Sequence, residues 1–352
     1  MSLQKIPGLI DIHVHLREPG STHKEDFYTG SRAAIAGGFT FIVDMPNNPT
    51  PTISRIRLEE KVNLSKEKAL CNIGFHFGTN GKNIEEFIYA IESPNVFGLK
   101  VYCNHTTGEM LIEDSKLLED VFSNWNSPKP ILVHAEGEQL ARVLSLGDKY
   151  KRRLHVCHIS QKSEVEMVRE AKRRGQEVTA GVTPHHLYFT KEALEDLKGY
   201  AMMKPPLGDR EDIEALWEGL KDGTIDIVES DHAPHTKEEK QIGTDGKSPA
   251  FGVPGLETTL GLMYKAVQDG RITNEEVIKF LYTNPKKIFN IPDQNDTYIE
   301  LDPKLSYIAG KNGYESKCGW SPFEGMTLYG KPQTVVINGE KILENGVIIN
   351  NK

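Results

Sequence analysis

The residues of this chain best suited to chemistry are histidines and an aspartate near the ends of short apolar segments. They are His13, His15, His134, His158, Asp231, His232 and His235. Imidazole nitrogens and carboxylate oxygens are ligands that Zn²⁺ prefers, and a catalytic zinc keeps a coordination position open. Two such ions about 3.5–4 Å apart can hold a bridging hydroxide that attacks a substrate. The residue types therefore indicate a hydrolytic metal centre.

Taken one at a time, these residues have ordinary explanations. His13 and His15 face one side of a strand, because side chains alternate along it, but such a pair is common by chance. His134 could be a hydrogen-bonded core histidine, and Asp231 could cap a helix. Lys100 is harder to explain, because it stands between apolar neighbours and burial favours the neutral, nucleophilic form of an amine. The joint pattern, with one such group on each of five segments, favours a shared site.

Eight short apolar segments have the length of β-strands, and charged helical stretches separate most of them. The strand segments are 8–15, 40–45, 72–78, 96–102, 131–136, 154–159, 177–184 and 226–234, and the clearest helical stretches are 55–70, 84–91, 163–174 and 209–220. Parallel strands need crossover connections, so this alternation predicts a parallel sheet. Eight units in roughly 230 residues favour a closed (β/α)₈ barrel of the TIM type. An open doubly wound sheet would want a phosphate-binding glycine loop after the first strand, and residues 16–20 lack its glycine pattern.

The candidate ligands come at or near the carboxyl ends of the expected strands, which form the active-site face of such a barrel. We expect the barrel to occupy residues 1–290 and a small C-terminal β appendage to occupy residues 291–352. Two strand-like runs in that appendage, 333–338 and 341–349, carry turn signals at Asn338-Gly339 and Asn345-Gly346.

Composition excludes several functional classes. The chain has 352 residues and a net charge of −8, from 42 basic and 50 acidic residues, which argues against a nucleic-acid surface. No apolar run approaches the roughly 20 residues that span a bilayer, and the first residues lack the apolar stretch of a signal peptide. The four cysteines are scattered, so they indicate neither a disulfide framework nor a cysteine-type zinc site. We expect a protein of the reducing cytoplasm with no membrane or nucleic-acid partner.

Four motifs of the chain resemble those of the dihydroorotases, which are amidohydrolases. Residues 11–20, Asp-Ile-His-Val-His-Leu-Arg-Glu-Pro-Gly, and residues 230–236, Ser-Asp-His-Ala-Pro-His-Thr, are similar to two signatures of that family. Residues 98–102 and 156–160 match as well, and the likeness runs from about residue 7 to about residue 325. It is especially close to the dihydroorotase domain of the animal multifunctional pyrimidine-synthesis protein, which also has a lysine at the position of Lys100.

The resemblance implies a reaction and a metal centre. The reaction is the reversible zinc-dependent cyclisation of N-carbamoyl-L-aspartate to L-dihydroorotate in de novo UMP biosynthesis, with a metal-bound hydroxide attacking the ring amide. Asp231 would be the general acid/base on the ring nitrogen. The implied ligands are His13, His15 and Asp231 for one zinc, His134 and His158 for a second, and carboxylated Lys100 as the bridge.

The resemblance also implies a site for the substrate. Arg17, Asn47 and His235 would hold the substrate carboxylate, and a planar guanidinium suits that task. The backbone of Phe251-Gly252 would contact the pyrimidine ring. The implied substrate-binding residues are therefore His15, Arg17, Asn47, His235, Phe251 and Gly252.

The chain departs from the family pattern at several positions. In a loop that closes over the site in the family, Thr106 matches but Thr107 replaces a phenylalanine, so we expect weaker contacts between this lid and the substrate. Lys204 stands where relatives have asparagine or arginine, and it could contact substrate or solvent. Gly181 replaces a glutamate that, with a cysteine at the position of Cys157, is linked to an extra zinc in the animal domain. We therefore expect no third metal.

Two further family features bear on the architecture. The tandem pair His185-His186 follows Pro184, and we assign neither histidine as a ligand. Many relatives carry an N-terminal β segment that joins the C-terminal strands. The start of this chain shows no such segment, so we expect an appendage that is small or packed against another subunit.

Two alternatives to a dihydroorotase have different chemistry or none. A dihydropyrimidinase or allantoinase would share the metal ligands and the lysine, but its substrate lacks the carboxylate that Arg17 and Asn47 would hold. A non-catalytic homologue that scaffolds a transcarbamoylase should have lost ligands, and every expected ligand type is present. On resemblance alone we expect a homodimer, and an active enzyme could also associate with aspartate transcarbamoylase.

Overall fold

Eight parallel strands form a nearly closed barrel in the computed structural model, which describes residues 3–105, 110–241 and 248–349. Each strand pairs in parallel with the next one along the chain. The strands are β2 (Leu9–Val14), β3 (Phe39–Asp44), β4 (Asn72–Gly78), β5 (Val96–Tyr102), β6 (Ile131–His134), β7 (Leu154–Val156), β8 (Val178–Val182) and β9 (Ile227–Val228). The (β/α)₈ architecture expected from the sequence is therefore confirmed.

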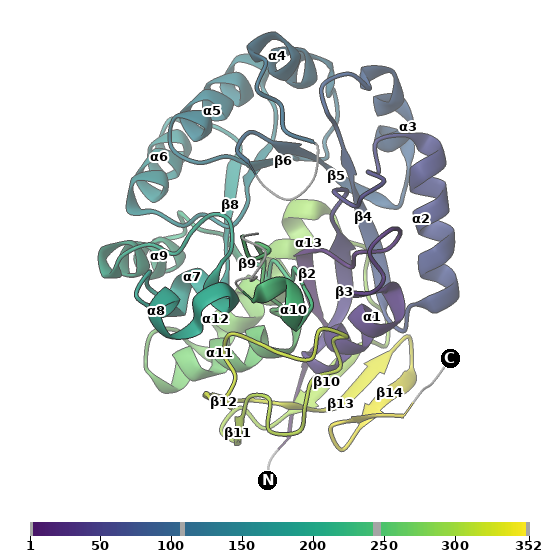
Figure 1. The fold of residues 1–352 in the computed structure, drawn as a ribbon, viewed down its shortest axis with the longest axis vertical. Coiled ribbons are helices and arrows are strands. Elements are labelled where there is room, and N and C mark those ends of the chain that lie inside the picture. The colour runs from purple at the N-terminus through teal and green to yellow at the C-terminus, as the bar shows by residue number, and fades with distance from the viewer. Residues whose placement is uncertain (1–2, 106–109, 242–247, 350–352) are drawn as a thin grey trace.

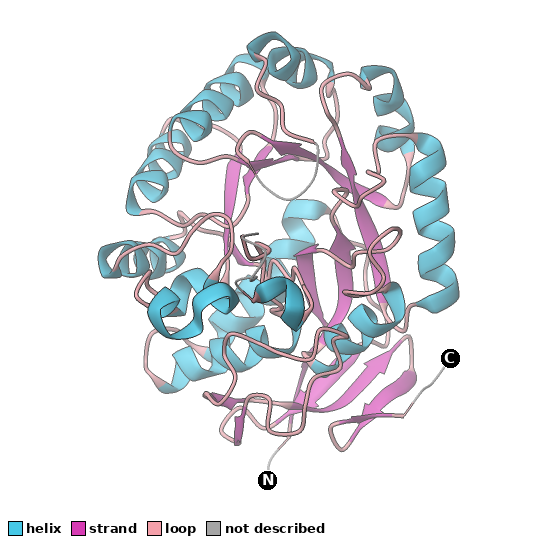
Figure 2. Ribbon diagram, in the orientation of Figure 1, coloured by secondary structure: helices cyan, strands magenta, loops and turns pink. Residues whose placement is uncertain are grey.

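Helices connect the strands and surround them as an outer layer (Figures 1 and 2). Those of the outer layer are α1 (Phe27–Ala36), α2 (Arg55–Lys68), α3 (Phe87–Glu92), α4 (Ser115–Asn124), α5 (Glu138–Tyr150), α6 (Lys162–Arg173), α9 (Arg210–Asp222) and α11 (Leu256–Gln268). Helix α6 shows why these segments are helical. Its buried Val165, Val168 and Ala171 recur every third residue and make one apolar face, while a capping box at Gln161 starts the helix.

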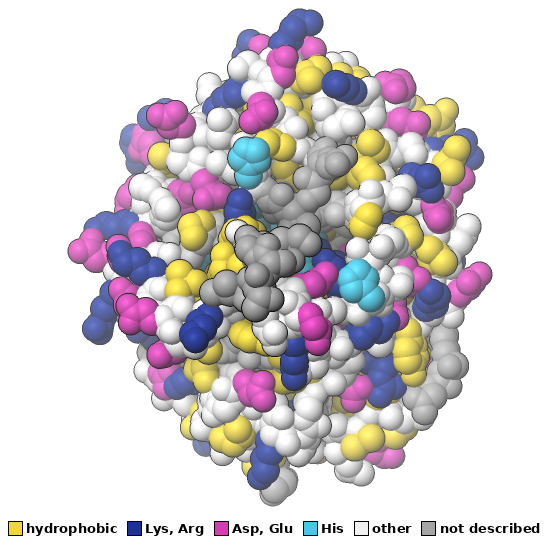
Figure 3. Space-filling model, in the orientation of Figure 1, with side chains coloured by type: hydrophobic (Ala, Val, Ile, Leu, Met, Phe, Trp, Pro, Cys, Tyr) yellow, Lys and Arg dark blue, Asp and Glu magenta, His cyan; other side chains and the backbone are white. Residues whose placement is uncertain are grey.

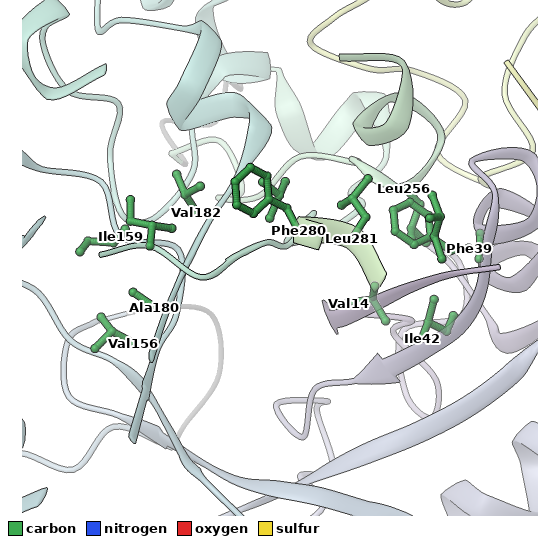
Figure 4. Close-up of a cluster of buried hydrophobic side chains, with 14 of the residues drawn as sticks. Val14, Phe39, Ile42, Val156, Ile159, Ala180, Val182, Leu256, Phe280 and Leu281 are labelled. Atoms are coloured by element: carbon green, nitrogen blue, oxygen red, sulfur yellow. The ribbon is translucent and has the colours of Figure 1, made fainter. Parts of the chain in front are cut away.

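The core lies in two layers, because strands of a parallel barrel are buried on both faces. One layer packs between the strands and the outer helices; Figure 4 shows part of it, with Val14 and Ile42 of the strands facing Leu256 of α11. The other fills the barrel interior with Ile10, Phe41 and Leu132, among others. It is closed at one end by Phe289 of α13 (Asn284–Phe289), whose ring contacts two strand histidines, His76 and His155.

The last barrel strand is much shorter than the sequence suggests. The apolar run 226–234 contributes only two residues to β9, because the chain leaves the ladder after Val228 and Asp231 takes a left-handed backbone conformation with φ of 44°. The first and last strands meet through a single bridge between Val14 and His232 and through a 2.7 Å hydrogen bond from the His15 N–H to the His232 carbonyl. This seam is where the ladder of the barrel is thinnest.

A second, smaller sheet packs beside the barrel, at the lower edge of Figure 1 near both ends of the chain. Its strands, in spatial order, are β1 (Gln4–Pro7), β10 (Tyr298–Leu301), β13 (Pro332–Ile337), β14 (Glu340–Glu344) and β15 (Val347–Ile348). A separate hairpin pairs β11 (Ser306–Ile308) with β12 (Thr327–Tyr329). The two strand-like runs of the tail are confirmed, the second of them broken into β14 and β15.

The expectation that no N-terminal strand joins this sheet is wrong. Residues 4–7 form β1, antiparallel to β10, and bury Ile6. Four residues with one apolar side chain are too few to show strand alternation, so only the partner strand reveals them. The division of the chain at residue 290 stays a prediction, with β1 lying in the sheet of the appendage.

The described helices include none that is both long and apolar enough to cross a bilayer. Acidic and basic side chains are interspersed over the face shown in Figure 3.

Candidate metal centre and active site

The predicted ligands converge at the carboxyl ends of the barrel strands. His13 lies near the end of β2, Lys100 within β5 and His134 at the end of β6, whereas His158 and Asp231 follow β7 and β9. All five side chains are buried. His15, just beyond β2, lies 10% exposed beside them. The sequence prediction that five separate strands supply one site agrees with this placement.

Asp231 joins the two histidines of the first strand. Its Oδ1 lies 3.3 Å from His13 Nε2 and 3.1 Å from His15 Nε2. One atom each from His13, His158 and Asp231 lie within 4.8 Å of one another, which is close enough for them to share a metal ion.

The histidines of β6 and β7 face each other. His134 Nδ1 lies 3.0 Å from His158 Nε2, and their rings are 4.7 Å apart. Two facing imidazole nitrogens satisfy each other only if one of them carries a proton, whereas a cation between them would accept both lone pairs. Of the remaining ring nitrogens, His158 Nδ1 is buried without a hydrogen-bond partner, and His134 Nε2 lies 3.5 Å from Glu136 Oε1. This arrangement fits a metal-binding pair better than a core histidine pair.

Burial keeps these imidazoles neutral, as metal ligands must be. It lowers the pKa of His15 to about 3 and also lowers the pKa values of His134 and His158. For Asp231, burial alone would raise the pKa, but the charge interaction with His13 and the hydrogen bond from His15 outweigh it and hold the pKa well below its usual range. The carboxylate is therefore ionised, beside the neutral imidazoles of His15, His134 and His158.

Lys100 is fully buried among these groups. Its Nζ donates a 3.1 Å hydrogen bond to Cys157 Sγ and lies 5.1 Å from the centre of the Tyr102 ring. Lys100 also contributes to the lowered pKa values of His134 and His158. A thiol is a weak acceptor, so the hydrogen bond to Cys157 holds the lysine amine only weakly at the ligand cluster.

The residues predicted to hold a substrate carboxylate lie together next to the ligands. Arg17 donates from Nε to the Pro234 carbonyl at 3.1 Å, and its terminal nitrogen lies 3.1 Å from His235 Nε2. Asn47 Oδ1 lies 2.8 Å from His15 Nδ1, so it links the carboxylate residues to the ligands. A cavity of about 160 Å³ opens between them, lined among others by His15, Arg17, Lys24 and Asn47. A larger cavity, of about 610 Å³, lies away from these residues against Glu257 and the loop 306–315.

The segment Phe251-Gly252 borders the same site, but part of its backbone is already bonded within the protein. The Phe251 carbonyl lies 3.0 Å from His235 Nε2, and the Gly252 N–H donates to the Met202 carbonyl. Lys204 is close by, with Nζ 4.8 Å from the centre of the Phe251 ring. The predicted contacts of this segment with a ring stay predictions.

Other predicted positions have mixed outcomes. His186 is bonded through both ring nitrogens, to Thr183 Oγ1 and to the Pro205 carbonyl, whereas the buried His185 Nε2 has no hydrogen-bond partner. Neither observation assigns a ligand role to the pair. Thr106 and Thr107, expected in the lid, lie outside the described residues.

Sequence reasoning missed two charged residues of the site. Glu229, fully buried after β9, lies 3.4 Å from His13 Nδ1. Lys24 Nζ lies 3.2 Å from His235 Nδ1 and 3.1 Å from Glu239. Glu229 had a signal like that of Lys100, namely a charge directly after an apolar strand core, whereas nothing in the run around Lys24 distinguishes it from a solvated loop lysine.

The barrel and its ligand cluster are features of a metal-dependent hydrolase, and comparison of the sequence with known protein families identifies the family. A model described as the amidohydrolase family matches residues 5–342, and the chain belongs to that family. The multifunctional protein pyr1-3 of Dictyostelium discoideum is 41% identical over 353 residues, 99% of this chain but only 15% of that protein. A dihydroorotase of a Thermoanaerobacter species is 35% identical over 369 residues, 95% of this chain and 85% of that enzyme.

Solved structures of two differently named kinds of protein share this fold. An L-hydantoinase (dihydropyrimidinase) from Arthrobacter aurescens superposes with a TM-score of 0.93 at 26% identity, over 98% of this chain and 86% of its own. An inactive dihydroorotase-like domain of a CAD-like multifunctional protein from Chaetomium thermophilum has a TM-score of 0.81 at 26% identity, over 99% and 97% of the two chains. The fold is therefore shared by active and inactive relatives, and the site must separate them.

Proposed function

We propose that this chain is a zinc-dependent dihydroorotase that interconverts N-carbamoyl-L-aspartate and L-dihydroorotate, a step of pyrimidine biosynthesis. The observation that carries the proposal is the position of Arg17, which lines the 160 Å³ cavity together with the predicted ligand His15 and contacts His235. A fixed guanidinium beside a histidine suits a carboxylate, and a cyclic amide without a carboxylate has no use for it. Relatives named dihydroorotase over nearly the whole chain support the same activity.

Six residues would hold the metal. His13, His15 and Asp231 form one group, His134 and His158 the second, and Lys100 lies close to both histidines of the second group. Carboxylation of Lys100 by CO₂ would convert the buried amine into a carbamate anion, which is suited to bridging two cations. Zinc at this site supplies Lewis-acid polarisation of a carbonyl and a water whose pKa is lowered to about 7.

Asp231 is suited to move the proton. It is ionised, because its pKa lies well below the usual range, and both histidine contacts fall on Oδ1. Oδ2 is left to take a proton from the attacking water and to return it to the ring nitrogen when the amide opens. In the direction of ring closure the same carboxylate removes the proton from the ureido nitrogen.

Arg17 orients the substrate in this scheme. Its Nε is tied to the Pro234 carbonyl, three residues beyond Asp231, so a carboxylate bound by the guanidinium places the ring at a fixed distance from the general acid/base. His235 and Asn47 would complete the hydrogen bonds to that carboxylate.

The test measures ring closure of N-carbamoyl-L-aspartate and ring opening of L-dihydroorotate by the purified chain, with zinc content determined on the same sample. Dihydrouracil, hydantoin and allantoin are the comparison substrates, because the hydantoinase-like fold is compatible with them. We expect turnover of the carboxylate-bearing pair and about 10- to 150-fold lower kcat/KM for the others, as the loss of a charged hydrogen-bond pair predicts. Turnover of dihydrouracil without turnover of dihydroorotate would refute the proposal in favour of a dihydropyrimidinase.

A non-catalytic scaffold is the second candidate, favoured by the inactive CAD-like relative. Such a protein has no need of a complete ligand set, whereas this chain brings together every predicted ligand type. The homodimer and the association with aspartate transcarbamoylase stay predictions, as do the cytoplasmic location and the lid. Sedimentation of the chain with and without a transcarbamoylase would test both assemblies.

A further inference from the structure

Glu229 is a buried carboxylate that none of the proposed catalytic steps uses. It follows β9 directly and lies two residues before Asp231, with none of its surface exposed. One oxygen, Oε1, lies 3.4 Å from His13 Nδ1 and accepts a 2.5 Å hydrogen bond from the backbone N–H of His158. The other, Oε2, lies 3.3 Å from His155 Nε2. A single side chain thus contacts β2, β7 and the turn that carries a second predicted ligand.

The Glu229 carboxyl group also occupies the space beside Gly181 of β8, where other residues would have a side chain. A Cβ atom added to Gly181 would lie 2.6 Å from Glu229 Cδ, closer than any real contact between such atoms. Glycine at position 181 therefore makes room for the carboxylate, so the identities of positions 181 and 229 depend on each other.

The contact with His13 sets which ring nitrogen can bind a metal. His13 Nε2 faces Asp231, and Nδ1, which makes no well-formed hydrogen bond, faces Glu229 Oε1 at 3.4 Å. An imidazole that binds a metal through Nε2 carries its proton on Nδ1, and a carboxylate beside Nδ1 stabilises that tautomer and fixes the plane of the ring. The hydrogen bond to the His158 N–H acts on the backbone, because His158 has a left-handed φ of 35° that a tie to its N–H helps to hold.

We infer that Glu229 is a positioning residue of the metal centre, which orients His13 through Nδ1 and His158 through its backbone from the end of β9. The inference rests on the proposed metal centre, but not on the identity of the substrate. It differs from a direct ligand role, which the grouping of His13, Cys157 and Glu229 within 4.8 Å would also allow. Both oxygens of Glu229 already have partners, which favours positioning over ligation.

Zinc binding tests the inference without use of catalysis. The metal-free protein is reconstituted with zinc, and affinity is measured by competition with a chromophoric chelator, together with the zinc bound per chain at saturation. We expect Glu229→Gln to lower the affinity about 10- to 100-fold while the saturating amount of zinc stays that of the wild type. The control is Glu257→Gln, which removes a half-buried carboxylate whose hydrogen bonds go to the backbone of Glu315 and Ser316 and not to the ligands, and it should leave zinc affinity unchanged.

Moving the carboxylate to the neighbouring strand provides a second test. A side chain at position 181 points at the place of the Glu229 carboxyl, so Gly181→Asp alone should crowd Glu229 and lower the melting temperature. In the double variant Gly181→Asp with Glu229→Ala, the aspartate on β8 places a carboxylate where that of Glu229 was. We expect the double variant to bind zinc at least about tenfold more tightly than Glu229→Ala alone, which a residue that only packs the core would not bring about.

Three results would overturn the inference. The first is a zinc affinity of Glu229→Gln equal to that of the wild type. The second is the loss of one whole equivalent of zinc at saturation in Glu229→Gln, which would make Glu229 a ligand, and the third is a double variant that binds zinc no more tightly than Glu229→Ala. A wild-type chain that binds no zinc would also remove the role. A wild-type chain that binds zinc but does not act on dihydroorotate would refute only the proposed function, so the two failures are distinguishable.

Discussion

Arg17 decides which ring this site can act on, because the metal ligands are common to cyclic-amide hydrolases. Its side chain is 7% exposed and is held by the Pro234 carbonyl, so its position is set before substrate arrives. The Arg17 side chain lines the cavity shared with His15 and Asn47. Specificity for a carboxylate therefore depends on one buried cation placed next to an otherwise general hydrolytic centre.

Replacement of Arg17 by methionine should lower kcat/KM for dihydroorotate about 10- to 150-fold, mainly through KM, because a charged hydrogen-bond pair contributes about 1.5–3 kcal/mol. Zinc content should not change. Steady-state kinetics with metal analysis is the measurement, and Arg271→Met, which breaks a surface pair with Glu214, is the control. Unaltered kinetics in the Arg17 variant would mean that the carboxylate binds elsewhere.

Replacement of Lys100 by alanine should abolish zinc binding and activity together, because the residue is fully buried at the ligand cluster. Small carboxylic acids such as acetate should restore part of both, since they would fill the vacated space with a bridging carboxylate. Metal analysis and activity with and without added acid test this. Full zinc occupancy in the variant without acid would argue against a carboxylated bridge.

Helix α11 holds the loop after β11 through one carboxylate. Glu257 is half-buried and accepts hydrogen bonds of 3.0 Å from the backbone N–H groups of Glu315 and Ser316. Burial raises the pKa of Glu257 to about 7, from 4.5, in spite of these bonds. The folded protein therefore binds a proton at this residue that the unfolded chain releases at lower pH.

The sign of the resulting pH dependence follows from linkage. Because the folded pKa is raised, the stabilisation is complete below about pH 4.5 and is lost as pH rises through about 7, up to an amount on the order of 3 kcal/mol. Thermal melts from pH 5 to pH 8 should show a larger fall in the wild type than in Glu257→Gln. The exposed Glu324→Gln serves as the control, and parallel curves for wild type and Glu257→Gln would contradict the assignment.

At the scale of the whole molecule, the metal centre spans the weakest part of the barrel. Three of the candidate ligands, His13, His15 and Asp231, come from the two ends of the sheet, β2 and the segment after β9, which share a single ladder bridge. Metal bound there would link them directly. The seam should therefore depend on the metal for its stability more than the rest of the barrel does.

Removal of zinc with a chelator should lower the melting temperature and increase hydrogen exchange of residues 9–15 and 227–233, while β4, which supplies no predicted ligand, should change little. Exchange measured by mass spectrometry on the loaded and stripped protein provides the comparison, and added zinc should reverse the change. Equal deprotection of β4 and the seam would show that metal stabilises the barrel globally.

The strand pattern and the ligand types could be deduced from residue order. The runs 72–78 and 96–102 coincide with β4 and β5, because apolar strands of a parallel barrel are buried along their whole length and need no partner to be recognised. The ligands were identifiable because a histidine or aspartate after such a run has few structural reasons to be there. The motifs around His13 and Asp231 then narrowed the family.

Only the tertiary structure decided the features that depend on a partner distant in the chain. Strand β1 exists because β10 pairs with it, and β9 stops after two residues because the following segment closes the barrel around Asp231. Glu229 shows the same limit most clearly: its role depends on Gly181 and His13, which are 48 and 216 positions away. Residue types and their local spacing determine strands and candidate ligands, whereas the space around a buried charge is set by side chains from other strands.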